Sequence, residues 1–247
     1  MWAGGVSGPV PGWMCHVLGF RVPNMPELGW GEHVYAVRRG RYLMDPRDTQ
    51  YQRFFIGLPL PTSYQEGLDA LRRDWDPQVR SRVSWTRRGN WHLTLAFLGG
   101  LVASQVEAVE QALFNVRFPE FAVQAAGGGG FPPGKRPRVL WVGLKQGAEE
   151  SAALAERIWS VVQPLGFEPP RRPFRAHLTL MRVKQDCGDD WTPFLRSLGS
   201  RQWPRFWQDA FVLWQSELTP QGPVYTVRQR YSLVPATGDA EESALRA

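Results

Sequence analysis

Two of the four histidines in the chain open identical tetrapeptides, His92-Leu-Thr-Leu and His177-Leu-Thr-Leu. Side chains alternate between the two faces of a β-strand, so each histidine shares a face with its threonine while the leucines point to a core. Imidazole has an ordinary pKa near ~6.5, so one ring can be neutral and the other protonated close to neutral pH. Such a pair can take a proton from water and give one to a leaving oxygen.

The threonines of the two tetrapeptides, Thr94 and Thr179, add hydroxyl groups on the same faces. Hydroxyls donate hydrogen bonds to phosphate oxygens and stabilise the charge that develops on them. No cysteine, third histidine or carboxylate cluster accompanies the pair, so neither a metal site nor a cofactor is expected. A single strand histidine is more often structural than catalytic, but two histidines in matched tetrapeptides favour catalysis.

The tetrapeptides belong to an internal repeat with an offset of 177 − 92 = 85 residues. In each copy, a strand-like run (53–58, 138–144) precedes a helical pattern, and a second helix and a closing strand (near 121–124, 210–216) follow the tetrapeptide. A last strand is expected over 224–233 after a hairpin turn at 220–223. Gly127–Phe131, "GGGGF", lacks the Lys-Ser/Thr of a phosphate-binding loop and is interpreted as a flexible connector between the copies.

The expected helices have recognisable beginnings and apolar faces. Thr62 with Gln65, and Ser104 with Glu107, have the spacing of capping boxes. The apolar positions expected on the buried faces are Leu68, Leu71, Val106, Val109, Leu113, Leu154, Ile158, Val161, Val162, Phe194, Leu195 and Leu198, with Gly199 as a helix stop. A gene duplication with two pseudo-symmetric lobes is the economical account, and the interface between such lobes is a natural ligand cleft.

Regular patterning covers only part of the 247 residues. Residues 1–50 alternate Gly, Pro and scattered aromatics, and an irregular, disordered extension is expected there, with Met44 a candidate for the true translation start. Residues 51–235 are expected to form the folded domain of two lobes, and 236–247 a solvated tail.

The bulk properties are those of a soluble globule. The net charge of +6 and pI near 9.7 favour a polyanionic partner such as nucleic acid, although the basic residues form no long run. The two cysteines, Cys15 and Cys187, form no paired framework, which favours a reducing compartment. No apolar run could cross a membrane, and no Lys or Arg precedes Arg21, unlike a signal peptide. A cytoplasmic location is therefore expected, and nothing in the sequence requires more than a monomer.

The strings "NWHLTLAFLG" (90–99) and "RPFRAHLTLMRV" (172–183) resemble the paired H-x-T-x motifs of the two-histidine (2H) phosphoesterase superfamily. Within it, the chain is most similar to the RNA 2′,3′-cyclic phosphodiesterases, once described as 2′-5′ RNA ligases. "RVLWVGL" (138–144) and "SELTPQGPVYTV" (216–227) extend the resemblance, which runs from about Arg53 to Leu233. It implies an α+β, bilobal, duplicated fold, with two antiparallel sheets lining a central cleft and helices outside.

The resemblance also implies an activity, the metal-independent hydrolysis of RNA 2′,3′-cyclic phosphate ends to 2′-phosphates, with weak reversible 2′-5′ ligation. By matching positions, His92 would be the general acid and His177 the general base. Thr94 and Thr179 would hold phosphate oxygens, and Arg182 would clamp the phosphate. Ala176 stands where the family usually has proline, a departure that removes no chemical group.

Other residues near the motifs carry weaker expectations. Arg172 and Arg175 precede the second histidine and could contact an RNA backbone. Trp91 and Phe131 could stack on a terminal base, although Trp91 faces opposite to His92, which favours core packing. Two alternative functions remain: a phosphodiesterase acting on another small cyclic phosphate, and a non-catalytic module that binds RNA or a nucleotide. The intact tetrapeptides argue for catalysis.

Overall fold

The computed structural model describes residues 51–235 except 221, so the expectations for 1–50 and 236–247 lie outside the described residues. The described part contains nine strands and four α-helices. The strands are β1 (Gln52–Pro59), β2 (Arg82–Trp85), β3 (His92–Leu101), β4 (Phe121–Phe131), β5 (Val139–Gln146), β6 (Leu178–Gln185), β7 (Phe206–Gln208), β8 (Ala210–Thr219) and β9 (Gly222–Ser232). The helices are α1 (Thr62–Trp75), α2 (Ala103–Leu113), α3 (Ala148–Val162) and α4 (Thr192–Ser200).

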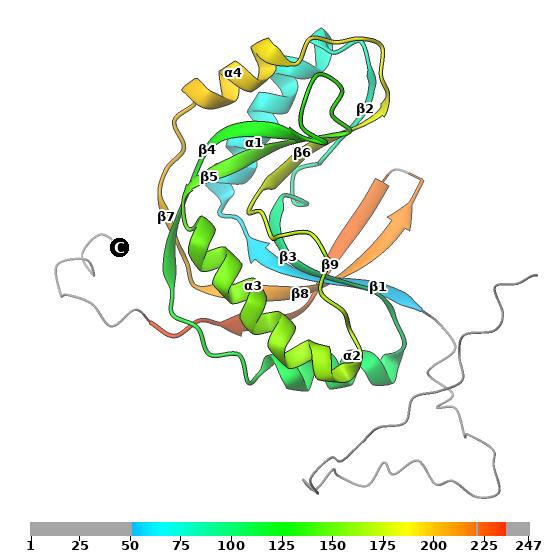
Figure 1. The fold of residues 1–247 in the computed structure, drawn as a ribbon, viewed down its shortest axis with the longest axis vertical. Coiled ribbons are helices and arrows are strands. Elements are labelled where there is room, and N and C mark those ends of the chain that lie inside the picture. The colour runs from blue at the N-terminus through cyan, green and yellow to red at the C-terminus, as the bar shows by residue number, and fades with distance from the viewer. Residues whose placement is uncertain (1–50, 221, 236–247) are drawn as a thin grey trace, which may run out of the picture. The chain divides into compact units, whose positions relative to one another are not determined.

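The strands pair in the order β7-β4-β5-β6-β3-β1-β8-β9, and β2 also pairs with β6. All pairings between named strands are antiparallel, and the sheet curls with the helices on its outer face (Figure 1). We call β1, β3, β8 and β9 the His92 half, and β2, β4, β5, β6 and β7 the His177 half. The expected α+β fold of antiparallel strands is confirmed, but the strands form one continuous sheet, because its two halves join through β3 and β6.

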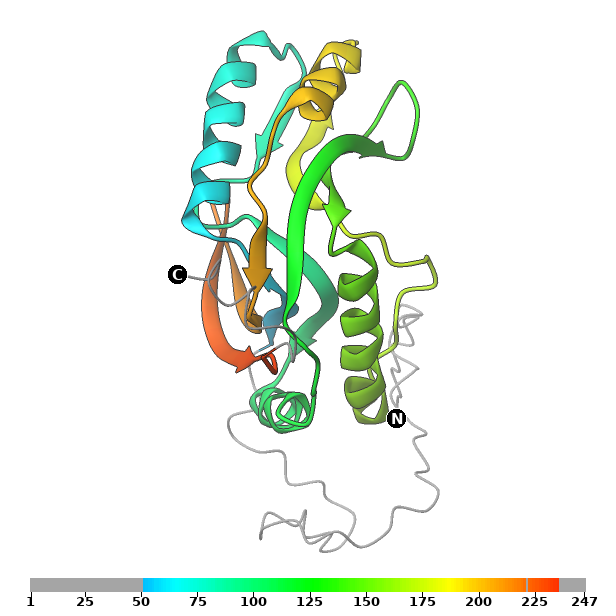
Figure 2. The same cartoon turned by 90° about the vertical axis from the view of Figure 1, so that its left-hand side faces the viewer.

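The closing strand of each repeat copy pairs in the opposite half. The strand that ends the first copy, β4, pairs with β5 of the second copy, and β8, which ends the second copy, pairs with β1 of the first. In Figure 2, β4 runs as a long bent strand from the end of α2 toward the end that carries α1 and α4. The two copies are therefore interleaved and do not form two separate lobes in sequence order.

The core lies between the sheet and the helices. The apolar faces predicted for the four helices are buried at Leu68, Leu71, Val106, Val109, Leu113, Leu154, Ile158, Val162, Phe194 and Leu198, while Val161 and Leu195 are partly buried against the same core. None of the helices in the described region is long and apolar enough to cross a bilayer.

Both predicted capping boxes are wrong. Pro61 caps α1 without a side-chain hydrogen bond, and Gln65 instead donates to the Trp91 carbonyl and accepts from the Gly89 N–H. The backbone N–H of Val102, which precedes α2, donates to Gln105, two residues before the predicted partner. Gly199 lies within α4, which ends one residue later at Ser200. At α1 the local spacing misled because Gln65 has partners distant in the sequence, in the segment before β3.

The glycine run is also different from its prediction, because Gly127–Phe131 is part of β4 and not a flexible connector. A side chain on Gly129 would place its Cβ at 2.4 Å from the Trp141 ring, and one on Gly128 would meet Leu198 and the Trp141 carbonyl. The strand therefore needs glycine because its neighbours approach closely.

Tyr64 ties α1 to β4 through a buried hydroxyl. Its hydroxyl donates to the Pro204 carbonyl at 2.8 Å and accepts the Ala125 N–H at 2.9 Å, and its side chain is fully buried. We expect Tyr64→Phe to lower the free energy of unfolding by about 1–3 kcal/mol, because both backbone groups lose their partner in the core. Urea denaturation measures the loss. Tyr51→Phe, at an exposed position, is the control, and equal stability of the two variants would contradict the prediction.

Candidate active site

The two identical tetrapeptides meet at the centre of the sheet. Leu93 of β3 pairs directly with Leu178 of β6, and the two residues are one repeat offset apart, 178 − 93 = 85. The axis that relates the two copies therefore passes through this pair. Both leucines are buried in the core, whereas His92 and His177 are half-buried on the opposite, concave face. The predicted alternation of the two strands is confirmed.

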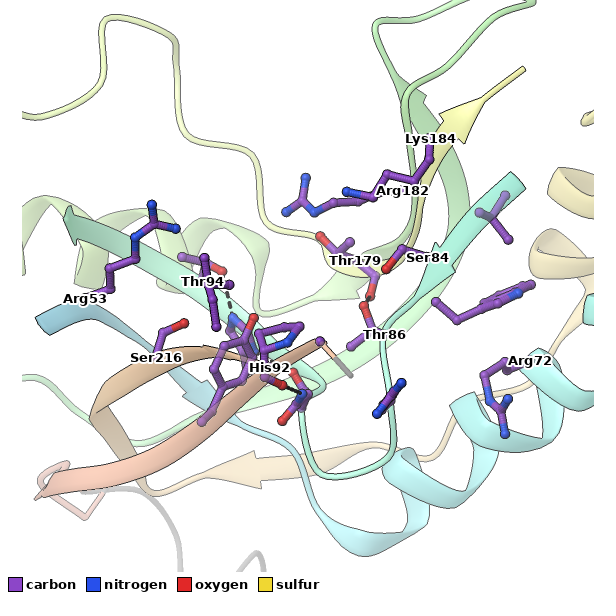
Figure 3. A pocket seen from close by; sticks show the side chains of 18 of the residues that line it. Arg53, Arg72, Ser84, Thr86, His92, Thr94, Thr179, Arg182, Lys184 and Ser216 are labelled. Atoms are coloured by element: carbon purple, nitrogen blue, oxygen red, sulfur yellow. Dashed lines mark hydrogen bonds between the residues drawn. The ribbon is translucent and has the colours of Figure 1, made fainter. Parts of the chain in front are cut away.

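A cavity of about 730 Å³ opens on this concave face, and both halves of the sheet contribute to its wall. His92, Thr94, Thr179 and Arg182 line it together (Figure 3). His177 lies two residues before the lining residue Thr179 and is not itself among the lining residues. Its charge acts on His92, and the charge of Arg182 acts on both histidines. The structure thus brings together all five residues that the sequence predicted.

Each histidine is held by the carbonyl two residues before it. Nδ1 of His92 lies 2.7 Å from the Asn90 carbonyl oxygen, and Nδ1 of His177 lies 2.7 Å from that of Arg175. A carbonyl only accepts, so Nδ1 carries the proton in both rings and Nε2 is left for chemistry. Sequence reasoning missed these positioning contacts, although Asn90 and Arg175 are themselves 85 residues apart.

The two threonines have different surroundings. Nε2 of His92 lies 3.0 Å from Oγ1 of Thr94, which donates to the neutral ring and would accept from the protonated one. Thr179 instead uses its backbone carbonyl to accept a 2.9 Å hydrogen bond from the Thr86 hydroxyl, which fixes β6 to the segment after β2. The site is therefore symmetric in backbone but not in hydrogen bonding.

Both histidines are biased toward the neutral form. Burial lowers the pKa of His92 to about 4, the charges of His177 and Arg182 act in the same direction, and the hydrogen bond to Asn90 opposes them. Burial also lowers the pKa of His177, assisted by the charges of Arg182 and Arg175 and opposed by the bond to the Arg175 carbonyl. Near neutral pH the free site thus holds two neutral rings, whereas the sequence had suggested one protonated ring.

Aromatic rings enclose His92, which explains its low pKa. The ring centroid of His92 lies 4.6 Å from that of Phe55, 5.4 Å from that of Tyr225 and 5.5 Å from that of Trp214. These rings shield part of the imidazole from water and so disfavour its charged form. Their scattered positions in the sequence, on β1, β8 and β9, gave no signal that they would gather here.

Aromatic rings also flank His177, at ring-centroid distances of 5.1 Å for Phe131 and 6.1 Å for Trp141. The guanidinium of Arg175 lies 4.4 Å from the centroid of the Trp141 ring. A second cavity, of about 440 Å³, is lined by Trp141, Arg175 and Gly128 beside this histidine.

Neither Trp91 nor Arg172, both weaker candidates for contacts with RNA, lies at a cavity wall. Trp91 is packed in the core with 2% of its surface exposed, as its strand position indicated, so it cannot stack on a base. Arg172 is exposed and lines neither of the two cavities.

The main cavity is strongly basic. Arg53, Arg72, Arg82, Arg87, Arg182 and Lys184 line it, and no Asp or Glu is among the lining residues. Within 51–235, no three His, Cys, Asp or Glu side chains gather in a group that could hold a metal ion. A pair of imidazoles, hydroxyl donors and excess positive charge can bind an anionic phosphate and move protons on both sides of it.

Comparison with known proteins gives a consistent result. A family model described as "LigT like Phosphoesterase" matches twice, at residues 58–141 and 142–225. An RNA 2′,3′-cyclic phosphodiesterase of Thermus thermophilus is 37% identical over 73% of this chain and 90% of its own, and one of Archaeoglobus fulgidus is 31% identical over 70% and 96%. The crystal structure of Escherichia coli LigT complexed with 3′-AMP superposes with a TM-score of 0.61 at 26% identity, covering 75% of this chain and 99% of that one.

Proposed function

The chain belongs to the LigT-like phosphoesterase family, and from this premise we propose that it hydrolyses the 2′,3′-cyclic phosphate at the end of an RNA strand. The product is a 2′-phosphate beside a free 3′-hydroxyl. The observation that supports the proposal most directly is the meeting of two His–Thr pairs across the Leu93–Leu178 pair, beside a basic cavity that His92, Thr94 and Thr179 line. The relatives named RNA 2′,3′-cyclic phosphodiesterase support the choice of substrate.

Proton transfer by the two imidazoles accounts for the reaction. Nε2 of His177 takes a proton from water as the water oxygen forms its bond to phosphorus. The bond from phosphorus to the 3′ oxygen breaks, and the protonated Nε2 of His92 gives its proton to that oxygen. Atoms and charge balance, and the two rings exchange their protons with solvent before the next turnover.

The anionic substrate helps to prepare this state. Phosphate bound beside His92 favours the imidazolium form and so raises its pKa from the low value of the free protein. Thr179, Thr94 and Arg182 donate to the non-bridging oxygens, where charge accumulates in the transition state. Once Nε2 of His92 is protonated, it no longer accepts the hydrogen bond of the Thr94 hydroxyl, so this hydroxyl can donate to a phosphate oxygen instead.

The same site can join RNA ends when another nucleophile replaces water. An RNA 5′-hydroxyl in place of the water would attack the cyclic phosphate and form a 2′-5′ linkage, with the same two proton transfers. Water is present in great excess over any RNA end, so hydrolysis predominates and ligation is a weak side reaction.

The decisive experiment is incubation of the purified protein with a short RNA that ends in a 2′,3′-cyclic phosphate. Conversion to a 2′-phosphate end, absent from the His177→Ala variant, would support both the reaction and the site. Tight retention of the RNA without conversion would overturn catalysis and favour a binding module. Neither conversion nor binding would indicate a different cyclic phosphate.

Hydrolysis is expected to proceed at an unchanged rate in EDTA, because imidazoles, hydroxyls and a guanidinium supply every proton transfer and charge contact that the proposed mechanism needs. Initial rates with and without the chelator measure this. Strong inhibition that added metal ions reverse would contradict the metal-independent mechanism.

The pH dependence of kcat/KM is expected to be bell-shaped with its maximum below pH 6.5. This parameter reports the free protein, in which the pKa values of both histidines are lowered, so the protonated form of His92 is lost as the pH rises. The optimum of kcat should lie at higher pH, because bound phosphate raises the pKa of His92. A maximum of kcat/KM above pH 7 would contradict these protonation states.

A further inference from the structure

A row of polar and basic side chains leads away from the histidines along β2 and β6. Ser84 of β2 is paired directly with Arg182 of β6, and Arg82 and Lys184 lie further along the same two strands. All four line the cavity that contains His92. Figure 3 shows Ser84, Arg182 and Lys184 together at one side of the cavity, beyond Thr179. We call Arg82, Ser84 and Lys184 the basic stripe.

Among the described residues, no carboxylate pairs with the charged side chains of the basic stripe. Within the described residues, neither Arg82 nor Lys184 forms an ion pair. Two arginines close by do, since Arg80 pairs with Asp189 at 3.5 Å and Arg136 pairs with Asp186 at 3.8 Å. Arg82 and Lys184 thus face the cavity without an ion-pair partner among the described residues, whereas these two neighbouring arginines outside the cavity are paired. Unpaired positive charge on a cavity wall is the electrostatic complement of a phosphodiester chain.

The basic residues of the stripe do not follow from the duplicated fold itself, because the equivalent strand of the other repeat copy lacks them. The pairing of β3 with β1 skips Leu95, and that of β6 with β5 skips Leu180, 85 residues later. The two strands therefore share one irregularity, and the cavity-lining residues that follow it, Phe97 and Arg182, occupy equivalent places.

The chemistry at these equivalent places differs. The His177 half offers Arg182 and Lys184, whereas the His92 half has Phe97 and Gly99 at the same offset. Among the described residues, no strand corresponding to β2 lies beside β3. Of the basic cavity-lining residues that lie on strands, β2 and β6 carry Arg82, Arg182 and Lys184, whereas the His92 half carries only Arg53 of β1.

We propose that the basic stripe binds the phosphodiester that links the terminal nucleotide to the rest of the RNA, so that the preferred substrate is an oligoribonucleotide and not a mononucleotide cyclic phosphate. The inference rests on the proposed function, because the reacting phosphate fixes where the chain begins. Arg182 holds that reacting phosphate, and the stripe continues from it. Alternate residues on one face of a strand are about 6.6 Å apart, so the stripe reaches beyond a single phosphate group.

The test compares two substrates, an eight-nucleotide RNA with a 2′,3′-cyclic phosphate end and cytidine 2′,3′-cyclic phosphate. The wild-type chain is expected to have the higher kcat/KM on the RNA. In the double variant Arg82→Ala/Lys184→Ala, kcat/KM on the RNA should fall by at least about tenfold for each charged contact removed. Its kcat/KM on the mononucleotide should stay unchanged. The slope of log kcat/KM against log salt concentration for the RNA should become shallower by about 1.4, because two phosphate contacts are lost. Arg157→Ala, an exposed charge on α3 outside the cavity, is the matched control.

Several outcomes would overturn the inference. If kcat/KM falls equally on both substrates, Arg82 and Lys184 act at the reacting phosphate or stabilise the fold. If kcat/KM is unchanged on both substrates, the two residues do not bind the RNA. If Arg53→Ala lowers kcat/KM on the RNA alone while the double variant is unaffected, the RNA lies along β1 and not along the basic stripe. Failure of the wild-type chain to hydrolyse either substrate would disprove the proposed function itself, and the inference would fall with it.

Discussion

Replacing either His92 or His177 with alanine is expected to lower kcat by about 10²–10⁴-fold, the usual contribution of a positioned acid or base. In each ring only Nε2 is left for proton transfer, because Nδ1 is held by a backbone carbonyl, so no other atom of the ring can take over. The double variant should be little worse than the singles, since both proton transfers serve one step. Single-turnover assays on RNA with a cyclic phosphate end measure the effect.

A modified substrate separates the two roles. When sulfur replaces the bridging 3′ oxygen, the leaving group departs as a thiolate, which needs no proton because its conjugate acid has a pKa near ~8.5. The sulfur substrate should restore much of the rate of His92→Ala and little of that of His177→Ala. Rescue of His177→Ala alone would reverse the two roles. A single variant that keeps more than a tenth of the wild-type rate, with an unchanged circular dichroism spectrum, would remove that residue from catalysis.

Arg182→Ala is expected to lower kcat/KM by at least about 100-fold, because the variant removes from the cavity wall the guanidinium that, in the proposed mechanism, donates two hydrogen bonds to the phosphate. Arg182→Lys should recover part of the loss, since it restores the charge but not the planar fork. Arg72→Ala is the matched control, because Arg72 lines the same cavity but is bound to Asp69 at 3.0 Å.

The pH profile adds a readout that a purely structural role of Arg182 would not change. The Arg182 charge lowers the pKa of both His92 and His177, so its removal should raise both pKa values. The bell-shaped profile of kcat/KM should therefore move to higher pH in Arg182→Ala and stay in place in Arg182→Lys. An unshifted profile in Arg182→Ala would show that the guanidinium does not act on the histidines in solution.

The sequence predicted the centre of the site well because the information there is local. A histidine and a threonine two residues apart share a strand face whatever surrounds them, and the offset of 85 residues relates His92 to His177 directly. The buried leucines of both tetrapeptides follow from the same alternation.

Features that depend on distant partners were not predictable in the same way. Gly129 resembles a linker residue in the sequence, and only the Trp141 ring packed against it shows why it must be glycine in a strand. The Trp214 and Tyr225 rings near His92 come from strands that lie more than 115 residues later along the chain, since 214 − 92 = 122 and 225 − 92 = 133. Burial of His92 among these rings sets its pKa, so the protonation state of the free site depends on tertiary structure.

The exchange of closing strands bears on how such a protein can arise. Neither copy of the repeat can complete its own half of the sheet, because β4 finds its partner in β5 and β8 finds its partner in β1. An ancestor with one copy would have needed to exchange its closing strand with a second, identical chain. Its active site would then have formed only between the two molecules. By the same logic, cutting the present chain between β4 and β5 should yield two fragments that fold only on meeting each other.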